Sequence, residues 1–298
     1  MAKTKQKRKW GDRKDARRIR KTDSMHAFMP YLLPNRTDNE AVLSDYANVE
    51  NLEKYIAQKN ADNPDFKYTV FHGIVAALAK TIYLRPKMNY FYQGHRYYER
   101  NDLSFSFVVK RKFEDHSEEA LAIIKINKES EESPIEQVYG KVKKFVTKVR
   151  KENKTDGATD IISVLCKLPR FLLKFVLWVL RKLDYYGIMP TAISKEDPYY
   201  STVFVTNLGS IKASANYHHL TNWGTNSVFL IVGEMKNMQV VDKEGNTEIH
   251  KMIPLGFTVD ERIADGFYFA KSFKIFRHLI ENPELLDRPI QEDIDFTV

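Results

Sequence analysis

Six short runs of β-branched and other apolar residues recur along the chain, and they restrict its fold more than any other feature. Runs of this length and composition are typical of strands. They cover 41–49, 103–110, 120–126, 201–206, 228–233 and 249–259. Segments with helical periodicity or helix caps cover 51–59, 69–84, 133–152 and 266–280. Because strands and helices are intermixed, we predict an α+β fold with a large mixed β-sheet flanked by helices.

No internal repeat or low-complexity linker divides the 298 residues. We therefore expect a flexible basic tail over 1–10 and a single domain over 11–298, with an amphipathic helical insertion at about 156–196. The chain does not open with the apolar run of a signal peptide. Basic residues and Pro169 interrupt the apolar stretch 161–180, so a membrane-spanning helix is not expected.

Cysteine and glycine usage exclude several classes of protein. Cys166 is the only cysteine, which rules out an intrachain disulfide and a cysteine-based zinc site. The 12 glycines form neither of the common phosphate-binding loops nor a Gly-x-Ser-x-Gly elbow, which argues against nucleotide-binding enzymes and serine hydrolases. No bound metal is expected. The expected location is the cytoplasm, with a peripheral position at a membrane as the alternative.

The net charge of +8 comes from two segments. Residues 1–21 contain 11 Lys and Arg against two Asp, and 141–183 contain 12 against three acidic residues, so each carries a surplus of +9. The rest of the chain is acidic by about ten charges. Local basic patches on an acidic body favour docking of an anionic cofactor or a membrane over nucleic acid, so no nucleic-acid partner is expected. The alternative is that the first segment is a solvated tail and the second is the solvated face of a helix.

The insertion has an amphipathic core over 161–183. On a helical wheel its basic residues Lys167, Arg170, Lys174 and Arg181 lie within about 60° of one another, and apolar residues surround the remainder. Such a helix can lie in a membrane interface, or it can pack against its own oligomer or a protein partner. The sequence favours packing of this helix against protein over its contact with a membrane.

The most informative motif is PLGFTVDERIADG over 254–266. It resembles the end of the catalytic domain of the dihydrolipoyl acyltransferases of 2-oxoacid dehydrogenase complexes and of chloramphenicol acetyltransferase. These proteins share the pattern His-x-x-x-Asp-Gly, followed by a helix. Val-Thr-Asn-Leu-Gly over 205–209 is similar to the family's strand ending in Ser-Asn-Leu-Gly. Further similar segments lie in the family order at 13–25, 71–84, 86–89, 97–103 and 228–233.

This resemblance implies a chloramphenicol acetyltransferase-like fold and a homotrimer with active sites between subunits. Coenzyme A and an acyl acceptor with a thiol or hydroxyl group meet there, and a histidine acts as general base. A serine hydroxyl hydrogen-bonds the oxyanion, a position that Thr206 matches. Asp265 matches the aspartate that braces the site by pairing with an arginine, for which Arg17, Arg18 and Arg20 are candidates.

Glu261 stands at the position of the family's catalytic histidine. It is either a replacement base or a surface carboxylate paired with Arg262 or a lysine. An ordinary thiol and an ordinary glutamate differ in pKa by about four units, so proton transfer to the carboxylate is uphill by roughly 6 kcal/mol. The substrate loop also departs from the family, because it reads RKFEDH over 111–116.

His218 and His219 follow the strand that carries Thr206, and one of them is an alternative base. The other interpretation of this pair is a solvent-facing or core position. Three functions stay open: a CoA-dependent acyltransferase with an altered acceptor, a catalytically silent family member that binds a ligand or partner, and a membrane-surface scaffold. The first is favoured, with impaired activity because the usual histidine is replaced.

Overall fold

The computed structural model describes residues 8–110, 119–152, 157–242 and 244–296. Its main sheet has seven strands in the order β2-β10-β8-β7-β5-β6, with β9 paired to β10. The pairs β5–β7 and β7–β8 are parallel, and the others are antiparallel. The strands are β2 (Glu40–Asn48), β5 (Leu103–Lys110), β6 (Glu119–Ile126), β7 (Val203–Asn207), β8 (Val228–Val232), β9 (Lys236–Val241) and β10 (Thr247–Asp260). The predicted α+β fold with a mixed sheet is confirmed, and all six predicted strands are present.

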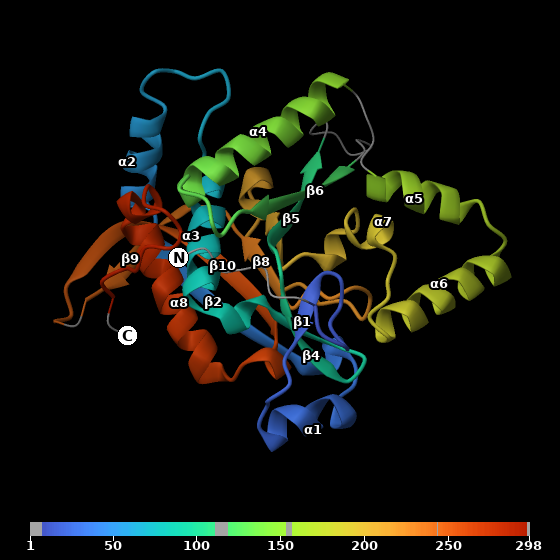
Figure 1. Cartoon of the computed structure of the whole chain (residues 1–298). Coiled ribbons are helices and arrows are strands. Elements are labelled where there is room, and N and C mark those ends of the chain that lie inside the picture. Colours follow the sequence, from blue (N-terminus) through green and yellow to red (C-terminus); the bar gives the residue numbers. More distant parts are fainter. Residues whose placement is uncertain (1–7, 111–118, 153–156, 243, 297–298) are drawn as a thin grey trace.

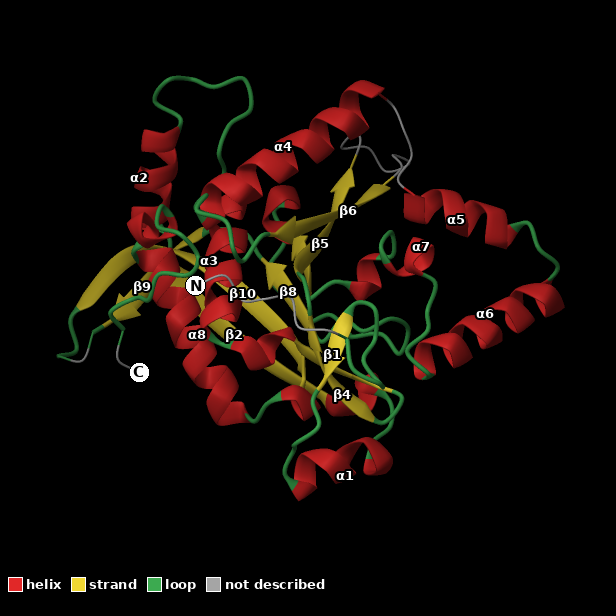
Figure 2. Ribbon diagram, viewed as in Figure 1, coloured by secondary structure: helices red, strands yellow, loops and turns green. Residues whose placement is uncertain are grey.

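Four helices pack on one face of this sheet, which we call the inner face (Figure 2). They are α2 (Glu50–Lys59), α3 (Val70–Leu84), α4 (Pro134–Glu152) and α8 (Gly266–Glu281), at the four predicted positions. Helix α3 is the most central, since every residue from His72 to Ile82 is buried. Alternate strand residues such as Phe105, Val205 and Phe257 point into this core.

The opposite face of the sheet, here the outer face, carries a smaller apolar cluster. Phe204 and Phe229 stack at 4.9 Å between ring centroids, and Leu220 and Ile231 complete the buried part. Leu220 belongs to the segment 212–227, which crosses this face between β7 and β8. The outer face therefore presents the side chains of β7 and β8 to that segment.

A second sheet of three strands, β1-β4-β3, lies beside the main sheet (Figure 1). Its strands are β1 (Ala16–Arg18), β3 (Tyr90–Gln93) and β4 (Arg96–Arg100), and helix α1 (Ser24–Leu32) follows β1. Arg100 at the end of β4 is buried, and its guanidinium lies 4.5 Å from the ring centre of Phe91. The carbonyl oxygens of Tyr200 and Thr225 accept hydrogen bonds from it. Burial lowers the pKa of Arg100 to about 9.

The helical segment after α4 consists of α5 (Gly157–Cys166), α6 (Arg170–Tyr185) and α7 (Thr191–Ser194). Figure 1 shows α5 and α6 extending away from the sheets. The end of α6 is fixed to the small sheet, because the buried Asp184 carboxylate accepts hydrogen bonds from Arg13 at 2.8 Å and Gln93 at 2.7 Å. Val176 and Leu180 of α6 also pack in a cluster with Met189 and Tyr200, so this part of the expected insertion is built into the fold.

A glycine makes the close contact between α6 and the small sheet possible. Gly94 lies in the turn between β3 and β4 with a positive φ of 58°. A Cβ atom there would stand 2.1 Å from the carbonyl oxygen of Tyr185. Both the turn conformation and the close approach favour glycine over any larger residue.

Candidate functional site

The turn that resembles the family motif lies between β10 and α8. Strand β10 ends at Asp260, a short 3₁₀ helix covers Glu261–Ile263, and α8 begins at Gly266. Asp260 is fully buried, and its carboxylate accepts hydrogen bonds from Arg262 Nε at 2.8 Å and Nη2 at 2.7 Å. Arg36 Nε lies 3.7 Å from the same carboxylate. This ion cluster fixes the turn that carries Glu261.

The ion cluster also connects the turn to two segments far away in the sequence. Arg262 donates to the carbonyl oxygens of Leu33 and Pro34, which follow α1. Arg36 donates to the carbonyl oxygens of Tyr92 and Gly224. Burial lowers the pKa of Arg36, and the negative charge of Asp260 opposes that shift. Asp260 therefore supplies the negative charge that faces two buried guanidinium groups.

Glu261 itself is exposed. Among the described residues Glu261 forms no ion pair with Arg262 or with a lysine. The physical reason is that Arg262 turns inward to Asp260, whereas Glu261 points outward from the same turn. The carboxylate of Glu261 is consequently open to a second molecule or subunit.

Asp265 caps the N-terminus of α8, since its Oδ1 accepts a hydrogen bond from the backbone N–H of Tyr268 at 2.7 Å. Among the residues that the structure describes, no arginine pairs with Asp265. Arg20 pairs with Asp12 at 3.0 Å instead, and the Asp12 carboxylate also accepts the backbone N–H of Arg18. The structure thus gives Asp265 the role of a helix cap.

Thr206 lies near the end of β7 and is half-buried on the outer face, because it is two residues from Phe204. It pairs with Ile231 of β8, and Ile231 pairs with Gly256 of β10. Strand β10 continues for four residues beyond Gly256, or roughly 13 Å, and Glu261 follows the end of that strand. One subunit therefore does not bring Thr206 and Glu261 together.

His218 lies on the same outer face as Thr206. Its ring stacks on that of Phe229 at 4.2 Å, and Phe229 is two residues before Ile231, the strand partner of Thr206. Its Nδ1 donates a hydrogen bond to the carbonyl oxygen of His219 at 2.9 Å, so Nε2 is the free acceptor of the neutral ring. His219 donates in the same way to the carbonyl oxygen of Leu220. Both histidines are exposed.

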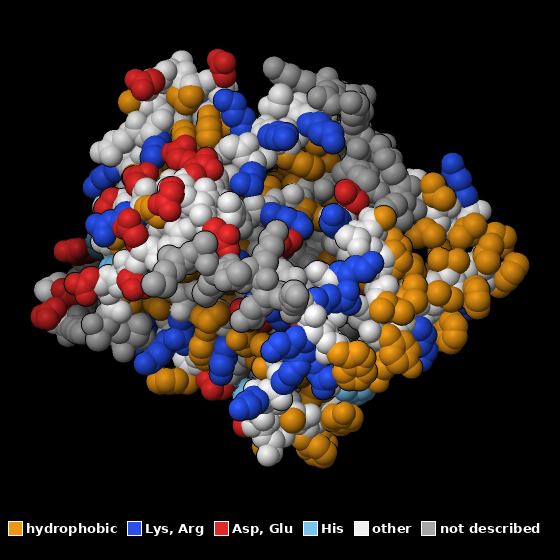
Figure 3. All heavy atoms as spheres, in the orientation of Figure 1, with side chains coloured by type: hydrophobic (Ala, Val, Ile, Leu, Met, Phe, Trp, Pro, Cys, Tyr) orange, Lys and Arg blue, Asp and Glu red, His pale blue; other side chains and the backbone are white. Residues whose placement is uncertain are grey.

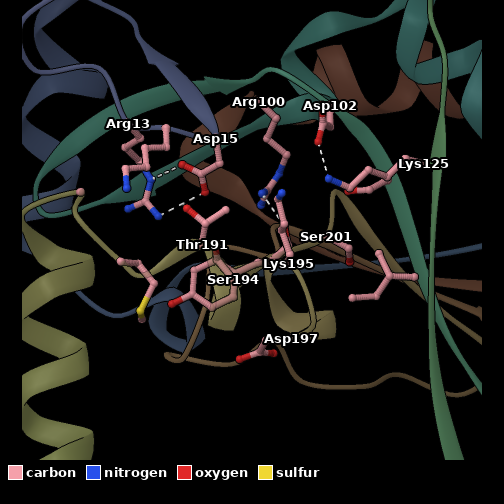
Figure 4. A pocket seen from close by; sticks show the side chains of 16 residues that line it. Arg13, Asp15, Arg100, Asp102, Lys125, Thr191, Ser194, Lys195, Asp197 and Ser201 are labelled. Carbon is pink, nitrogen blue, oxygen red and sulfur yellow. Dashed lines mark hydrogen bonds and ion pairs between the residues drawn. The ribbon is translucent and has the colours of Figure 1, made fainter. Parts of the chain in front are cut away.

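Two cavities flank the small sheet, and neither is lined by Thr206, Glu261, Asp265 or the histidine pair. The smaller one, of about 130 Å³, is seen in Figure 4, with Arg13 and Asp15 at one side and the ion pair of Lys125 with Asp102 at the other. The other cavity, of about 220 Å³, lies beside the buried Arg36 and Arg262. Arg36 was not identified from the sequence, because its partner Asp260 is distant in the sequence.

Residues 190–287 match the family model of the 2-oxoacid dehydrogenases acyltransferase (catalytic domain). This span contains all five candidate site residues. A search of curated proteins gave no match. The expected resemblance is confirmed over this part of the chain. The expected substrate loop at 111–116 lies outside the described residues.

Solved structures extend the similarity of fold over most of the chain. A probable dihydrolipoamide acetyltransferase from Listeria monocytogenes has a TM-score of 0.58 at 15% identity and covers 86% of this chain and 88% of its own. The cubic core of a pyruvate dehydrogenase multienzyme complex has a TM-score of 0.57 at 14% identity, with coverages of 91% and 94%. A chloramphenicol acetyltransferase has a TM-score of 0.52 at 9% identity, with coverages of 89% and 99%. The chain therefore has the fold of these acyltransferases.

Proposed function

We propose that this acyltransferase-like chain transfers an acyl group from acyl-CoA to a thiol or hydroxyl acceptor, at a site shared by two subunits of a homotrimer. The observation that carries the proposal is the register of the main sheet. It separates Thr206 and Glu261 along the strand direction, although both lie at motif positions within the family match. A neighbouring subunit that presents its own Glu261 turn to Thr206 completes the site.

The reaction follows from these two residue types. The acceptor oxygen or sulfur attacks the thioester carbonyl, a base takes the acceptor's proton, and the coenzyme A thiolate leaves. The Thr206 hydroxyl donates a hydrogen bond to the carbonyl oxygen as negative charge develops there. An exposed carboxylate is a weak base for a thiol, so we expect slow turnover of the natural protein.

His218 is the second candidate for the base. The observation that favours it is its position on the outer face near Thr206 within one subunit, with Nε2 free to accept a proton. Substituting His218 by Ala distinguishes the two mechanisms. It abolishes turnover if His218 is the base and leaves the slow turnover unchanged if His218 is not the base.

The shared site predicts a trimer. We expect light scattering behind size exclusion to report about three times the subunit mass of 34.9 kDa. The physical reason is that the exposed Glu261 and the outer face of β7 each supply one part of the same site. A monomer at micromolar concentration would contradict both the oligomer and the shared site.

A further inference from the structure

We propose that α5 and the outward side of α6 bind the surface of an anionic phospholipid membrane. We call this region the α5–α6 surface. It consists of the apolar residues Ile162, Val164, Phe171, Phe175 and Trp178 and the basic residues Lys167, Arg170, Lys174, Arg181 and Lys182. This proposal is independent of acyl transfer.

The apolar side chains of this surface are unusually exposed. Phe171 is 76% exposed, Phe175 59% and Trp178 56%, and Figure 3 shows a broad apolar area over α5 and α6. None of the apolar side chains described between 162 and 175 belongs to a buried cluster. Only the later part of α6 does, where Leu180 packs with Met189 and Tyr200. An apolar area of this kind marks a surface that another phase or molecule covers.

The charge of the surface has one sign. Its five Lys and Arg are exposed, whereas the one acidic residue between 161 and 190, Asp184, is buried and bonded to Arg13 and Gln93. The chain outside the two basic segments is acidic by about ten charges. An anionic membrane attracts this surface and repels the acidic body, which orients the protein with α6 toward the lipid.

The arrangement of the two residue types favours lipid over a protein partner. Phe171, Lys174, Trp178 and Arg181 follow one another at spacings of three or four, so aromatic and basic side chains alternate along one side of α6. A protein interface would have to supply a carboxylate for each buried cation. At a bilayer surface the aromatic rings enter the acyl boundary while Lys and Arg extend to the phosphates.

The length of the helices agrees with a position on the membrane surface. Helix α6 has 16 residues, or about 24 Å. Among the described residues no helix is both long and apolar enough to span a bilayer. The hydrogen bonds of Asp184 hold the end of α6 against the small sheet. Membrane binding through α6 therefore also orients the rest of the fold.

The first test is flotation with phosphatidylcholine vesicles, with and without about 30% phosphatidylglycerol. We expect binding to the anionic vesicles at low salt, at least fivefold weaker binding to neutral vesicles, and release near 0.5 M salt, where charges are screened over about 4 Å. The triple variant Phe171→Ser, Phe175→Ser, Trp178→Ser should lose binding more than tenfold, and Lys174→Glu about fivefold or more. Absence of flotation with anionic vesicles at low salt would overturn the proposal.

Matched controls distinguish membrane binding through this surface from nonspecific hydrophobic binding and from subunit contacts. Val241→Ser and Ile249→Ser remove apolar side chains that are 64% and 72% exposed on the β9–β10 ribbon, and binding should not change. All variants should keep the wild-type melting temperature and mass. A triple variant that changes the oligomer mass and still floats would assign the α5–α6 surface to a subunit contact and refute the proposal.

Cys166 offers a direct probe of the contact. It is the only cysteine of the chain and is exposed at the end of α5. A polarity-sensitive fluorophore attached to it should shift to shorter wavelength with anionic vesicles and stay unchanged with neutral ones. Flotation without this shift would place the membrane contact elsewhere and contradict the proposal.

Discussion

The Glu261→His variant should transfer the acetyl group of acetyl-CoA to a small thiol or alcohol roughly 10²- to 10⁴-fold faster than the natural protein. A positioned base with a pKa near neutrality contributes rate factors of this size. The variant places an imidazole on an exposed turn that the buried Asp260–Arg262 pair already holds. Chromatographic measurement of the thioester or ester product gives the rate without relying on a thiol reagent.

Two controls define this result. Glu261→Gln removes the carboxylate but keeps the size of the side chain, and it should leave the slow natural rate unchanged. Thr206→Ala in the Glu261→His background should lower the rate about 10²-fold or more, because the oxyanion loses its donor. Ordinary enzymatic turnover by the natural protein, abolished by Glu261→Gln, would instead make Glu261 the working base.

Asp260→Asn should destabilise the protein by about 3 kcal/mol or more. It removes the negative charge that faces Arg36 and Arg262, both nearly fully buried, and a buried cation without its partner costs this much. Urea unfolding followed by circular dichroism measures the change. Asp45→Asn is the matched control, because Asp45 pairs with Arg277 at 3.1 Å on a partly exposed surface. It should cost less than about 1 kcal/mol, and an equal effect of both substitutions would contradict the role of the cluster.

The main sheet and its helices could be predicted because their signals are local. Alternating apolar residues identify β5 and β6, and Thr69 marks the start of α3 with a capping box completed by His72. The small sheet could not be predicted in the same way. Strand β1 is three residues long and reads Ala-Arg-Arg, and the tyrosine-rich β3 and β4 show no clear alternation.

The positions of the candidate site residues could be predicted from the sequence, but their contacts could not. The motif located Thr206, Glu261 and Asp265, yet the sequence did not indicate that Arg262 pairs with Asp260 or that Asp265 caps α8. Contacts such as Arg13 with Asp184, 171 residues apart, leave no local pattern. They arise from packing of distant segments, which is why the buried arginines appear only in the folded chain.

The central claim is that this fold keeps the coenzyme A site of an acyltransferase despite Glu261. The most direct measurement is the melting temperature with and without coenzyme A, because a ligand that binds only the folded state stabilises it. At a concentration about 100 times the dissociation constant the gain is about 2.7 kcal/mol, which corresponds to a rise of about 5 °C or more. The account predicts this rise for the natural protein and equally for Glu261→His. No rise at millimolar coenzyme A in either protein would contradict it.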